Sequence, residues 1–202
     1  MEVEVKLRLL GSTAHQHLSD LLSTYHLRTH LQDNVFFDGS RSELSSRFAI
    51  LRLRFYDDDA RCVASLKAKA RLSSGISRVE EDEEDLDPVA ARSFISDPSK
   101  RKLLDSSRIM KRVYHEFGSE MVLVCLGGFR NVRAVYGWRE GLVLELDETH
   151  YDFGTCYEIE CETNEPEKAK ELLERFLTEN DVQYKYSENS KFAVFRAGKF
   201  LD

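Results

Sequence analysis

The sequence predicts an α+β protein that is mainly β, with antiparallel strands and helices packed on the outside of them. Three observations predict it. Several segments alternate between apolar and charged residues, short polar turns separate most of these segments, and three further segments carry apolar residues at helical spacing. At 202 residues, one domain spanning 1–202 is the simplest organisation.

The clearest strand is predicted over residues 2–9, where Glu2, Glu4, Lys6 and Arg8 alternate with four apolar residues. The same period of two predicts further strands over 48–56, 61–71, 76–84, 111–117, 120–126, 130–136, 141–149 and 156–162. Aspartates at 57–59 predict a hairpin turn, and glycines at 118, 127 and 128 predict further breaks. The polar residues 71–75 and the acidic run 80–87 are both interpreted as mobile. The acidic run is further interpreted as a solvated strand end or loop.

Helices are predicted over residues 13–25, 88–104 and 166–180. Pro98 is expected to divide the second of them, and Pro166 marks the start of the third. The apolar sides of the predicted strands also need cover. These three helices are available to provide it.

Charged residues spaced two apart share one face of their strand. Here the pairs are sorted by sign: Glu2 with Glu4, Glu145 with Asp147, Glu158 with Glu160, Arg52 with Arg54, and Lys67 with Lys69. One interpretation is the solvated face of an antiparallel sheet. The other is a closed barrel whose interior binds metal ions through carboxylates and phosphates through Lys and Arg. The spacing alone leaves both interpretations open.

Composition excludes several other classes. The net charge of −7 argues against a general nucleic-acid-binding surface. The four cysteines, Cys62, Cys125, Cys156 and Cys161, form no CxxC pair and are expected to be free thiols in a reducing compartment. No apolar run reaches the roughly 18 residues of a membrane span, and no secretory signal is expected, so we expect a cytoplasmic protein with no membrane partner. The histidines do not cluster, so zinc is not expected.

An ordered set of motifs adds a resemblance. The ExExK motif Glu2-Val3-Glu4-Val5-Lys6 is followed by Leu51-Arg52-Leu53-Arg54, Ser65-Leu66-Lys67-Ala68-Lys69, Arg133 and Glu158-Ile159-Glu160. This series resembles the CYTH superfamily of triphosphate tunnel metalloenzymes, most of all its compact plant members. The match runs from residue 2 to about residue 194 and implies an eight-stranded antiparallel barrel that binds a triphosphate along its axis with a divalent metal.

The resemblance also implies roles for individual residues. Catalytic roles fall to Glu2, Glu4, Lys6, Glu158 and Glu160, and metal ligation to Glu2, Glu4, Glu145, Asp147, Glu158 and Glu160. Substrate binding falls to Lys6, Arg52, Arg54, Lys67, Lys69, Arg78, Arg133, Lys185 and Lys191. Glu80 and Arg112 also fit the inward phase, without an assigned role.

The expected reaction is hydrolysis of inorganic triphosphate to pyrophosphate and phosphate by metal-activated water, with Mg²⁺ as cofactor and Mn²⁺ as a substitute. The short chain shows no extra domain to bind a base or a thiazolium ring, and we expect a monomer that binds only the small-molecule triphosphate. Alternatives are a hydrolase or cyclase acting on ATP, thiamine triphosphate or an RNA 5′-triphosphate, and a polyphosphate-binding module without catalysis.

Overall fold

The computed structural model describes residues 1–201. Within that range the strands are β1 (Glu2–Leu9), β2 (His26–Gly39), β3 (Ala49–Tyr56), β4 (Arg61–Ser73), β5 (Ile76–Leu86), β6 (Leu123–Gly137), β7 (Val143–Tyr151), β8 (Gly154–Glu162) and β9 (Tyr184–Tyr186). The helices are α1 (Ser12–Leu22), α2 (Pro88–Ser96), α3 (Arg108–Phe117), α4 (Pro166–Glu179) and α5 (Lys191–Ala197). Short 3-10 turns lie at Ser23–Tyr25, Ser45–Arg47, Arg101–Leu104 and Arg139–Gly141.

The strands pair in the order β5-β4-β3-β2-β6-β7-β8-β1-β9, and β5 also pairs with β1. The ring formed by β1 to β8 is therefore closed, with β9 added alongside β1. This confirms the predicted fold, an eight-stranded antiparallel barrel with helices outside it. A closed ring has no exposed edge strand, which removes a common route to aggregation.

The chain divides into two compact units. Unit 1 comprises Met1–His30, Arg71–Arg78 and the part from Arg130 onward, and unit 2 comprises Leu31–Ala70 and Val79–Phe129. Strands β2, β4, β5 and β6 each contribute residues to both. The single domain expected from the sequence stays a prediction, and each unit is described by itself.

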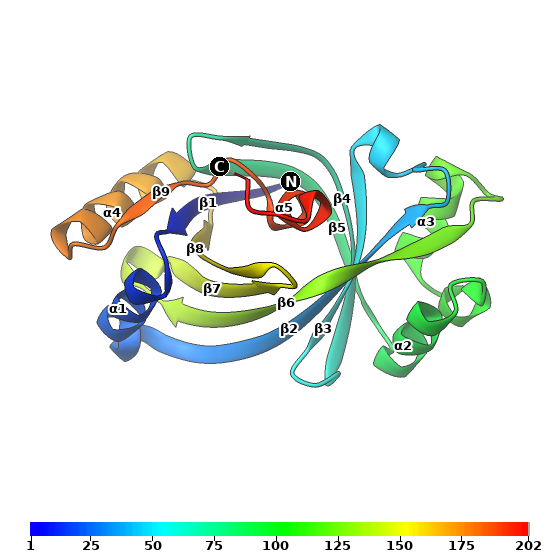
Figure 1. Cartoon of the computed structure of the whole chain (residues 1–202), viewed down its shortest axis with the longest axis horizontal. Helices are drawn as coiled ribbons and strands as arrows, with labels where there is room; N and C mark the ends of the chain where they lie inside the picture. The colour runs from blue at the N-terminus through cyan, green and yellow to red at the C-terminus, as the bar shows by residue number, and fades with distance from the viewer. Residues whose placement is uncertain (202) are drawn as a thin grey trace. The chain divides into compact units, whose positions relative to one another are not determined.

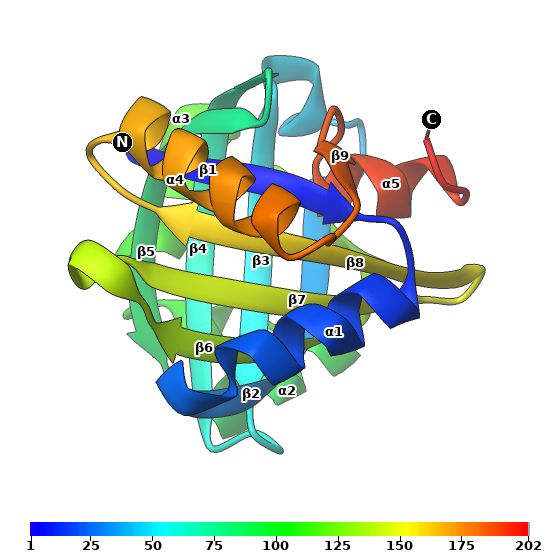
Figure 2. The same ribbon diagram turned by 90° about the vertical axis from the view of Figure 1, so that its left-hand side faces the viewer.

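The core of unit 1 lies on the apolar face of β1. Leu7 is fully buried there, and it belongs to one cluster with Leu18 and Leu22 of α1 and Leu173 and Leu177 of α4. Figure 2 shows α1 and α4 lying across the strands of this unit. Burying each such leucine contributes about 1.5–3 kcal/mol. The predicted helices 13–25 and 166–180 therefore cover the apolar strand faces, as expected.

The core of unit 2 is built in the same way from β2, β3, β4, α2 and α3, the last two drawn in green in Figure 1. Phe37 of β2 packs against Phe94 of α2 with ring centroids 5.2 Å apart, and Leu51 and Leu53 of β3 are buried beneath them. The predicted helix 88–104 ends at Ser96, and a 3-10 turn over Arg101–Leu104 follows Pro98. Proline divides the segment as expected.

One strand prediction was wrong, and the long strand β2 was missed. Residues 111–117 belong to helix α3, in which Ile109, Met110 and Val113 are buried at helical spacing. The segment Arg-Val-Tyr-His-Glu-Phe carries β-formers, but packing against the unit 2 core overrides that local preference. Strand β2 was not predicted at all, because Leu27 and Leu31 are exposed and its first half lacks a regular alternation.

The glycine pair at 127 and 128 lies inside β6 and does not end a strand. Gly127 has a φ of 83°, a left-handed conformation that favours glycine. A Cβ on Gly128 would overlap the backbone carbonyl of Asn34 in β2. The two predicted strands 120–126 and 130–136 are thus one long strand, and glycine marks a close backbone approach.

The acidic run 80–87 is part of strand β5 as far as Leu86 and is used on both faces. Of the two interpretations, strand end or loop, the structure therefore supports the strand. On one face, Glu84 accepts hydrogen bonds from the Ser107 hydroxyl, from the backbone N–H of Arg108 at 3.0 Å and from that of Ile109 at 3.1 Å. These are groups at the start of α3. Glu84 therefore completes the N-terminal cap of the helix from a neighbouring strand.

We expect Glu84→Ala to lower the free energy of unfolding by about 1–3 kcal/mol, because it leaves the first turn of α3 without its acceptor. Urea denaturation of the purified protein measures this. Glu80→Ala is the matched control, since the ion pair that Glu80 of the same strand makes with Lys69, at 3.0 Å, is exposed. Equal losses in the two variants would contradict the capping role.

All four cysteines are free thiols, as predicted, with Cys125 exposed and Cys62, Cys156 and Cys161 buried. Over residues 1–201, no helix is long and apolar enough to cross a membrane.

Candidate active site

In unit 1, four adjacent strands place charged residues in register on one face. Along one row, Arg133 of β6 lies opposite Asp147 of β7, Asp147 opposite Glu158 of β8, and Glu158 opposite Arg8 of β1. A second row two residues away joins Glu145, Glu160 and Lys6. Cross-strand partners on one face lie about 4.5–5.5 Å apart at Cβ, so their side chains meet. The motifs at the two ends of the chain therefore form one cluster.

Glu160 and Asp147 are the acidic centre of this cluster. Glu160 is 3% exposed and accepts from Lys6 and from Arg133, the latter at 2.6 Å. Asp147 is fully buried and receives two parallel hydrogen bonds from Arg133, at 2.8 Å from Nε and 2.6 Å from Nη2. Glu4 joins through Lys6, whose Nζ lies 3.3 Å from the Glu4 carboxylate. Charges so deeply buried are tolerated because each has an opposite partner.

Lys191 enters the cluster from α5. Its Nζ lies 2.8 Å from Asp147 and 3.0 Å from Glu158, and it also contacts Glu160. Ser190 caps this helix by accepting from the backbone N–H of Ala193, so Lys191 stands at the first helical position. Helix α5 was not predicted, although Lys191 was.

Several supporting residues were missed by sequence reasoning. Ser187 donates to Glu158 at 2.7 Å, and Asn131 donates to Asp147 at 2.9 Å while it accepts from Thr149 at 2.7 Å. Asn131 precedes Arg133 by two residues and so shares its strand face, which is a usable signal. Ser187 lies in a loop after β9, where no periodicity exists to reveal it.

The electrostatics favour the ionised forms of the buried carboxylates and of Lys6. Burial by itself would raise the pKa of Asp147, Glu158 and Glu160, but neighbouring cations outweigh it and the pKa of each is lowered. For Asp147 the largest such cation is Arg133, and for Glu158 and Glu160 it is Lys191. Burial likewise works against the charge on Lys6, yet Glu160 and Glu4 raise its pKa. Opposite charges within a few ångströms favour the charged forms.

These shifts predict how stability depends on pH. The carboxylate pKa values are lower in the folded protein than in the unfolded chain, where they lie near 4. Their stabilisation is therefore present above about pH 5 and is lost as the pH falls through the lowered folded values. Thermal denaturation of the metal-free protein between pH 3 and 7 should give a constant Tm above about pH 5 and a steep fall below about pH 4. A fall that begins above pH 6 would contradict this account.

In unit 2, the predicted cations Arg52, Arg54 and Lys67 form a second group. Arg52 is 8% exposed, and its Nη2 lies 3.3 Å from Glu81 and 3.3 Å from Glu83 of β5. Lys67 Nζ lies 2.8 Å from Glu81 as well. Burial and the adjacent charge of Arg54 lower the pKa of Arg52 to about 10.

Arg54 completes this second group, since its Nε donates to the Asn34 side chain at 2.8 Å. Three acceptors were missed by sequence reasoning, because Asn34 lies in the unpredicted β2 and Glu81 and Glu83 lie in the acidic run. Arg52 Nε is buried and has no hydrogen-bond partner among residues 1–201.

Other predicted site residues lie apart from these two groups. Lys69 has a φ of 54° and pairs with Glu80, whereas Lys67 contacts Glu81. Glu80 and Glu81 are adjacent in β5 and point to opposite faces of the sheet. The two lysines therefore do not share one face as predicted, because the left-handed conformation of Lys69 interrupts the alternation. Their roles in substrate binding stay predictions.

Arg78 is exposed and pairs with Glu167 of α4 at 3.0 Å. Arg112, expected to point inward from a strand, lies on helix α3 and pairs with Asp82 and Glu116. In β1, Glu2 precedes Glu4 by two residues on the same face and is half-buried. Lys185 lies on β9 opposite Arg8 and is exposed.

The carboxylate oxygens of the unit 1 cluster suit a hard cation such as Mg²⁺. In the described part of the chain, however, no three His, Cys, Asp or Glu side chains are arranged ready to hold a metal ion. The reason lies in the contacts above, because lysine and arginine occupy the carboxylate oxygens. The donor set fits a divalent metal, provided that Lys6 and Lys191 turn toward another anion when it binds.

The fold and the two groups together define a class: a closed antiparallel β-barrel with buried, interleaved carboxylates and cations. The CYTH domain model matches residues 1–195, and the chain therefore belongs to the CYTH domain family. A comparison with curated proteins finds no match.

Solved structures agree with this assignment. A protein from Hippeastrum, described as an adenylyl cyclase candidate with a dominant triphosphatase activity, is 58% identical, with a TM-score of 0.96, 100% of this chain covered and 98% of that one. An adenylate cyclase candidate from Bacillus halodurans is 21% identical with a TM-score of 0.73, covering 97% and 96%. A protein from Pyrococcus horikoshii is 18% identical with a TM-score of 0.65, covering 97% and 99%. The last two share the fold alone.

Proposed function

We propose that this chain is a metal-dependent triphosphatase that hydrolyses inorganic triphosphate to pyrophosphate and phosphate. One observation carries the proposal: in unit 1, Lys6, Arg133 and Lys191 converge on the buried carboxylates of Asp147 and Glu160. Such a cluster has both a set of anions for a metal and a set of cations for phosphate. The 58% identical Hippeastrum protein, with its dominant triphosphatase activity, supports the same reaction.

CYTH triphosphatases in general depend on a metal ion, and we propose Mg²⁺, with Mn²⁺ as a substitute. Its ligands would come from the acidic residues Glu2, Glu4, Glu145, Asp147, Glu158 and Glu160. When bound, it would neutralise phosphate oxygens and lower the pKa of a bound water.

The residues of the chain supply binding and electrostatic stabilisation. Lys6, Arg133 and Lys191 are positioned to exchange their carboxylate partners for phosphate oxygens, and Arg133 can bind two oxygens at once. Held in place before the reaction, these cations would stabilise charge that develops on the departing pyrophosphate. In unit 2, Arg52, Arg54 and Lys67 are proposed as further phosphate ligands, as the family resemblance implies. The unpaired thiols fit a reducing, cytoplasmic setting, which is part of the proposal.

The test is phosphate release from inorganic triphosphate, ATP, thiamine triphosphate and pyrophosphate, each with Mg²⁺ and with EDTA. We expect fast, Mg²⁺-dependent release from inorganic triphosphate and little from the others. In the same assay Glu4→Ala should abolish metal-dependent turnover, and full activity would remove Glu4 from the proposed ligands.

Preference for ATP, or conversion of ATP to cyclic AMP, would favour an enzyme acting on organic triphosphates. Binding of triphosphate without release of phosphate from any substrate would favour a binding module.

A further inference from the structure

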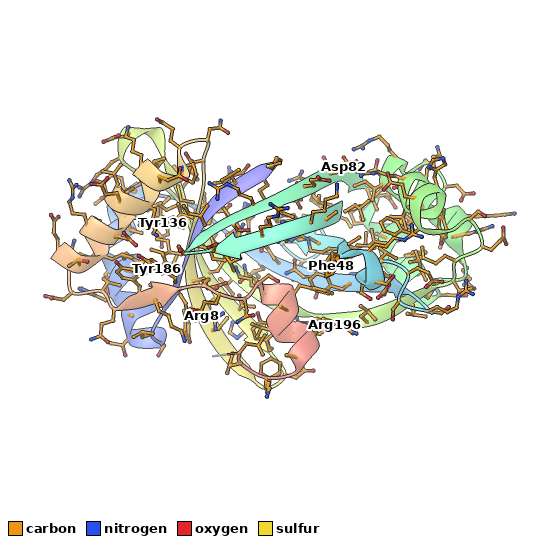
Figure 3. The ribbon with its side chains drawn as sticks, turned by 90° about the horizontal axis from the view of Figure 1, so that it is seen from above. Arg8, Phe48, Asp82, Tyr136, Tyr186 and Arg196 are labelled. Atoms are coloured by element: carbon orange, nitrogen blue, oxygen red, sulfur yellow. The ribbon has the colours of Figure 1, made fainter. Side chains whose placement is uncertain are left out.

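Unit 1 contains a pocket of about 490 Å³ whose lining includes residues with no assigned role. It is lined by Arg8 of β1, by Tyr184, Lys185 and Tyr186 of β9, by Ser187, Glu188 and Asn189 of the loop that follows, and by Leu201. Figure 3 labels Arg8 and Tyr186 on these two strands. A pocket of this size is large enough for a small ligand.

The charge of the pocket points to an anion. Arg8 and Lys185 lie directly opposite each other in the β1–β9 pairing. Like charges at such positions destabilise a sheet unless something compensates them. Arg8 Nε is buried and has no hydrogen-bond partner within residues 1–201, and the Arg8 Nη2 contact with Glu158 is long, at 3.5 Å. Among the described residues of the lining, the one acidic residue, Glu188, is exposed.

The remaining lining argues against an organic ligand. Tyr186 lies against α4, with Lys170 Nζ 4.1 Å from its ring centroid, and Tyr184 packs with the core beneath the same helix. Both rings are therefore partly engaged by α4: the Tyr186 ring is contacted by the Lys170 ammonium group, and the Tyr184 ring is packed at the edge of the core. A positively charged thiazolium ring would be repelled by Arg8 and Lys185. The side-chain amide of Asn189 adds a donor that suits phosphate oxygens.

The pocket adjoins the candidate active site through one carboxylate. Arg8 Nη2 and Ser187 Oγ both contact the same oxygen of Glu158, and Lys191 contacts the other. A ligand that reached from the cluster past Glu158 would enter the pocket.

We propose that the pocket binds the free terminal phosphate of inorganic triphosphate, and that Arg8 and Lys185 thereby select this substrate over organic triphosphates. The proposal rests on the proposed function. A free phosphate end carries a charge of about −1.5 to −2 near pH 7, as a phosphomonoester does, and can engage both cations. Inorganic triphosphate has two such ends, so one can occupy the reacting position while the other enters the pocket. In an organic triphosphate an ester-linked group replaces the second end, so less charge reaches the pocket.

The experiment compares kcat/KM for inorganic triphosphate and for ATP, with Mg²⁺, in Lys185→Ala, Arg8→Gln and Arg8→Lys. Lys168→Ala, an exposed lysine of α4, is the matched control. We expect the first two variants to lower the value for inorganic triphosphate by about 10- to 100-fold and that for ATP by less than about threefold, so that selectivity collapses. Arg8→Lys should recover part of the selectivity, because lysine restores the positive charge but lacks the planar guanidinium group.

Equal losses for both substrates, or no loss for either, would overturn the proposal and leave the proposed function standing. If the wild-type protein hydrolyses neither substrate, the proposed function fails. Calorimetric measurement of inorganic triphosphate binding in EDTA then tests whether the pocket binds an anion. Affinity reduced at least about tenfold in Lys185→Ala, with Lys168→Ala unchanged, would support an anion site there. Unchanged affinity would overturn it.

Discussion

Glu160→Gln is expected to lower kcat/KM for inorganic triphosphate by about 10³-fold. The carboxylate of Glu160 is shared by Lys6, Arg133 and Lys191, and it is buried. Glutamine has the same shape but no charge, so it removes a proposed metal ligand and weakens the hold on three phosphate-binding cations at once. The variant should also unfold more easily, by about 3 kcal/mol, because buried cations lose part of their compensation.

Circular dichroism at the assay temperature, beside the phosphate-release assay, separates loss of fold from loss of chemistry. A titration with Mg²⁺ should show a higher concentration for half-maximal activity in the variant. Glu171→Gln is the control, since Glu171 is exposed on α4 and pairs with Arg175 one turn away. Wild-type kcat/KM in Glu160→Gln would refute the central role given to this residue.

Arg133→Ala is expected to cost about 3–5 kcal/mol of stability, the usual penalty for leaving a buried charge without its partner. Asp147 is fully buried and depends on the two hydrogen bonds from Arg133. The alanine variant therefore tests stability, through its Tm and urea midpoint, more than it tests catalysis.

Arg133→Lys tests catalysis. Lysine keeps the charge but cannot bind two oxygens in parallel, so we expect a folded protein with kcat/KM lower by about 10²-fold. Arg130→Lys on the same strand is the control, because Arg130 is exposed. Equal activity in the two lysine variants would show that two-pronged binding at position 133 is not needed.

Much of the candidate site could be predicted from local alternation. Glu4 and Lys6, and Glu158 and Glu160, each share a face because strand side chains alternate strictly, and the structure brings the two pairs together. The alternation also included Arg8, which received no role because the family motif ends at Lys6. The pattern failed at Lys69, where a left-handed residue interrupts the alternation, and sequence spacing does not reveal such a break.

Elements defined by packing were beyond local rules. The second half of helix α3 includes the β-formers Val113, Tyr114 and Phe117, and the helix is stabilised because Glu84 caps it and Val113 is buried in the core of unit 2. Strand β2 has few apolar residues in its first half, and pairing with its neighbours fixes it. The glycines of β6 show a close approach of two strands, where the sequence suggested a turn.

The sequence by itself therefore determined the fold class, the family and most of the charged residues of the candidate site, because strand periodicity and ordered motifs are local properties of the chain. The tertiary structure alone decided which charges meet. It placed Lys191 among Asp147, Glu158 and Glu160, and it set Arg8 opposite Lys185 beside a pocket. The physical reason is register: which residue lies opposite which depends on the pairing of strands distant in sequence, and that pairing is fixed by burial of their apolar faces.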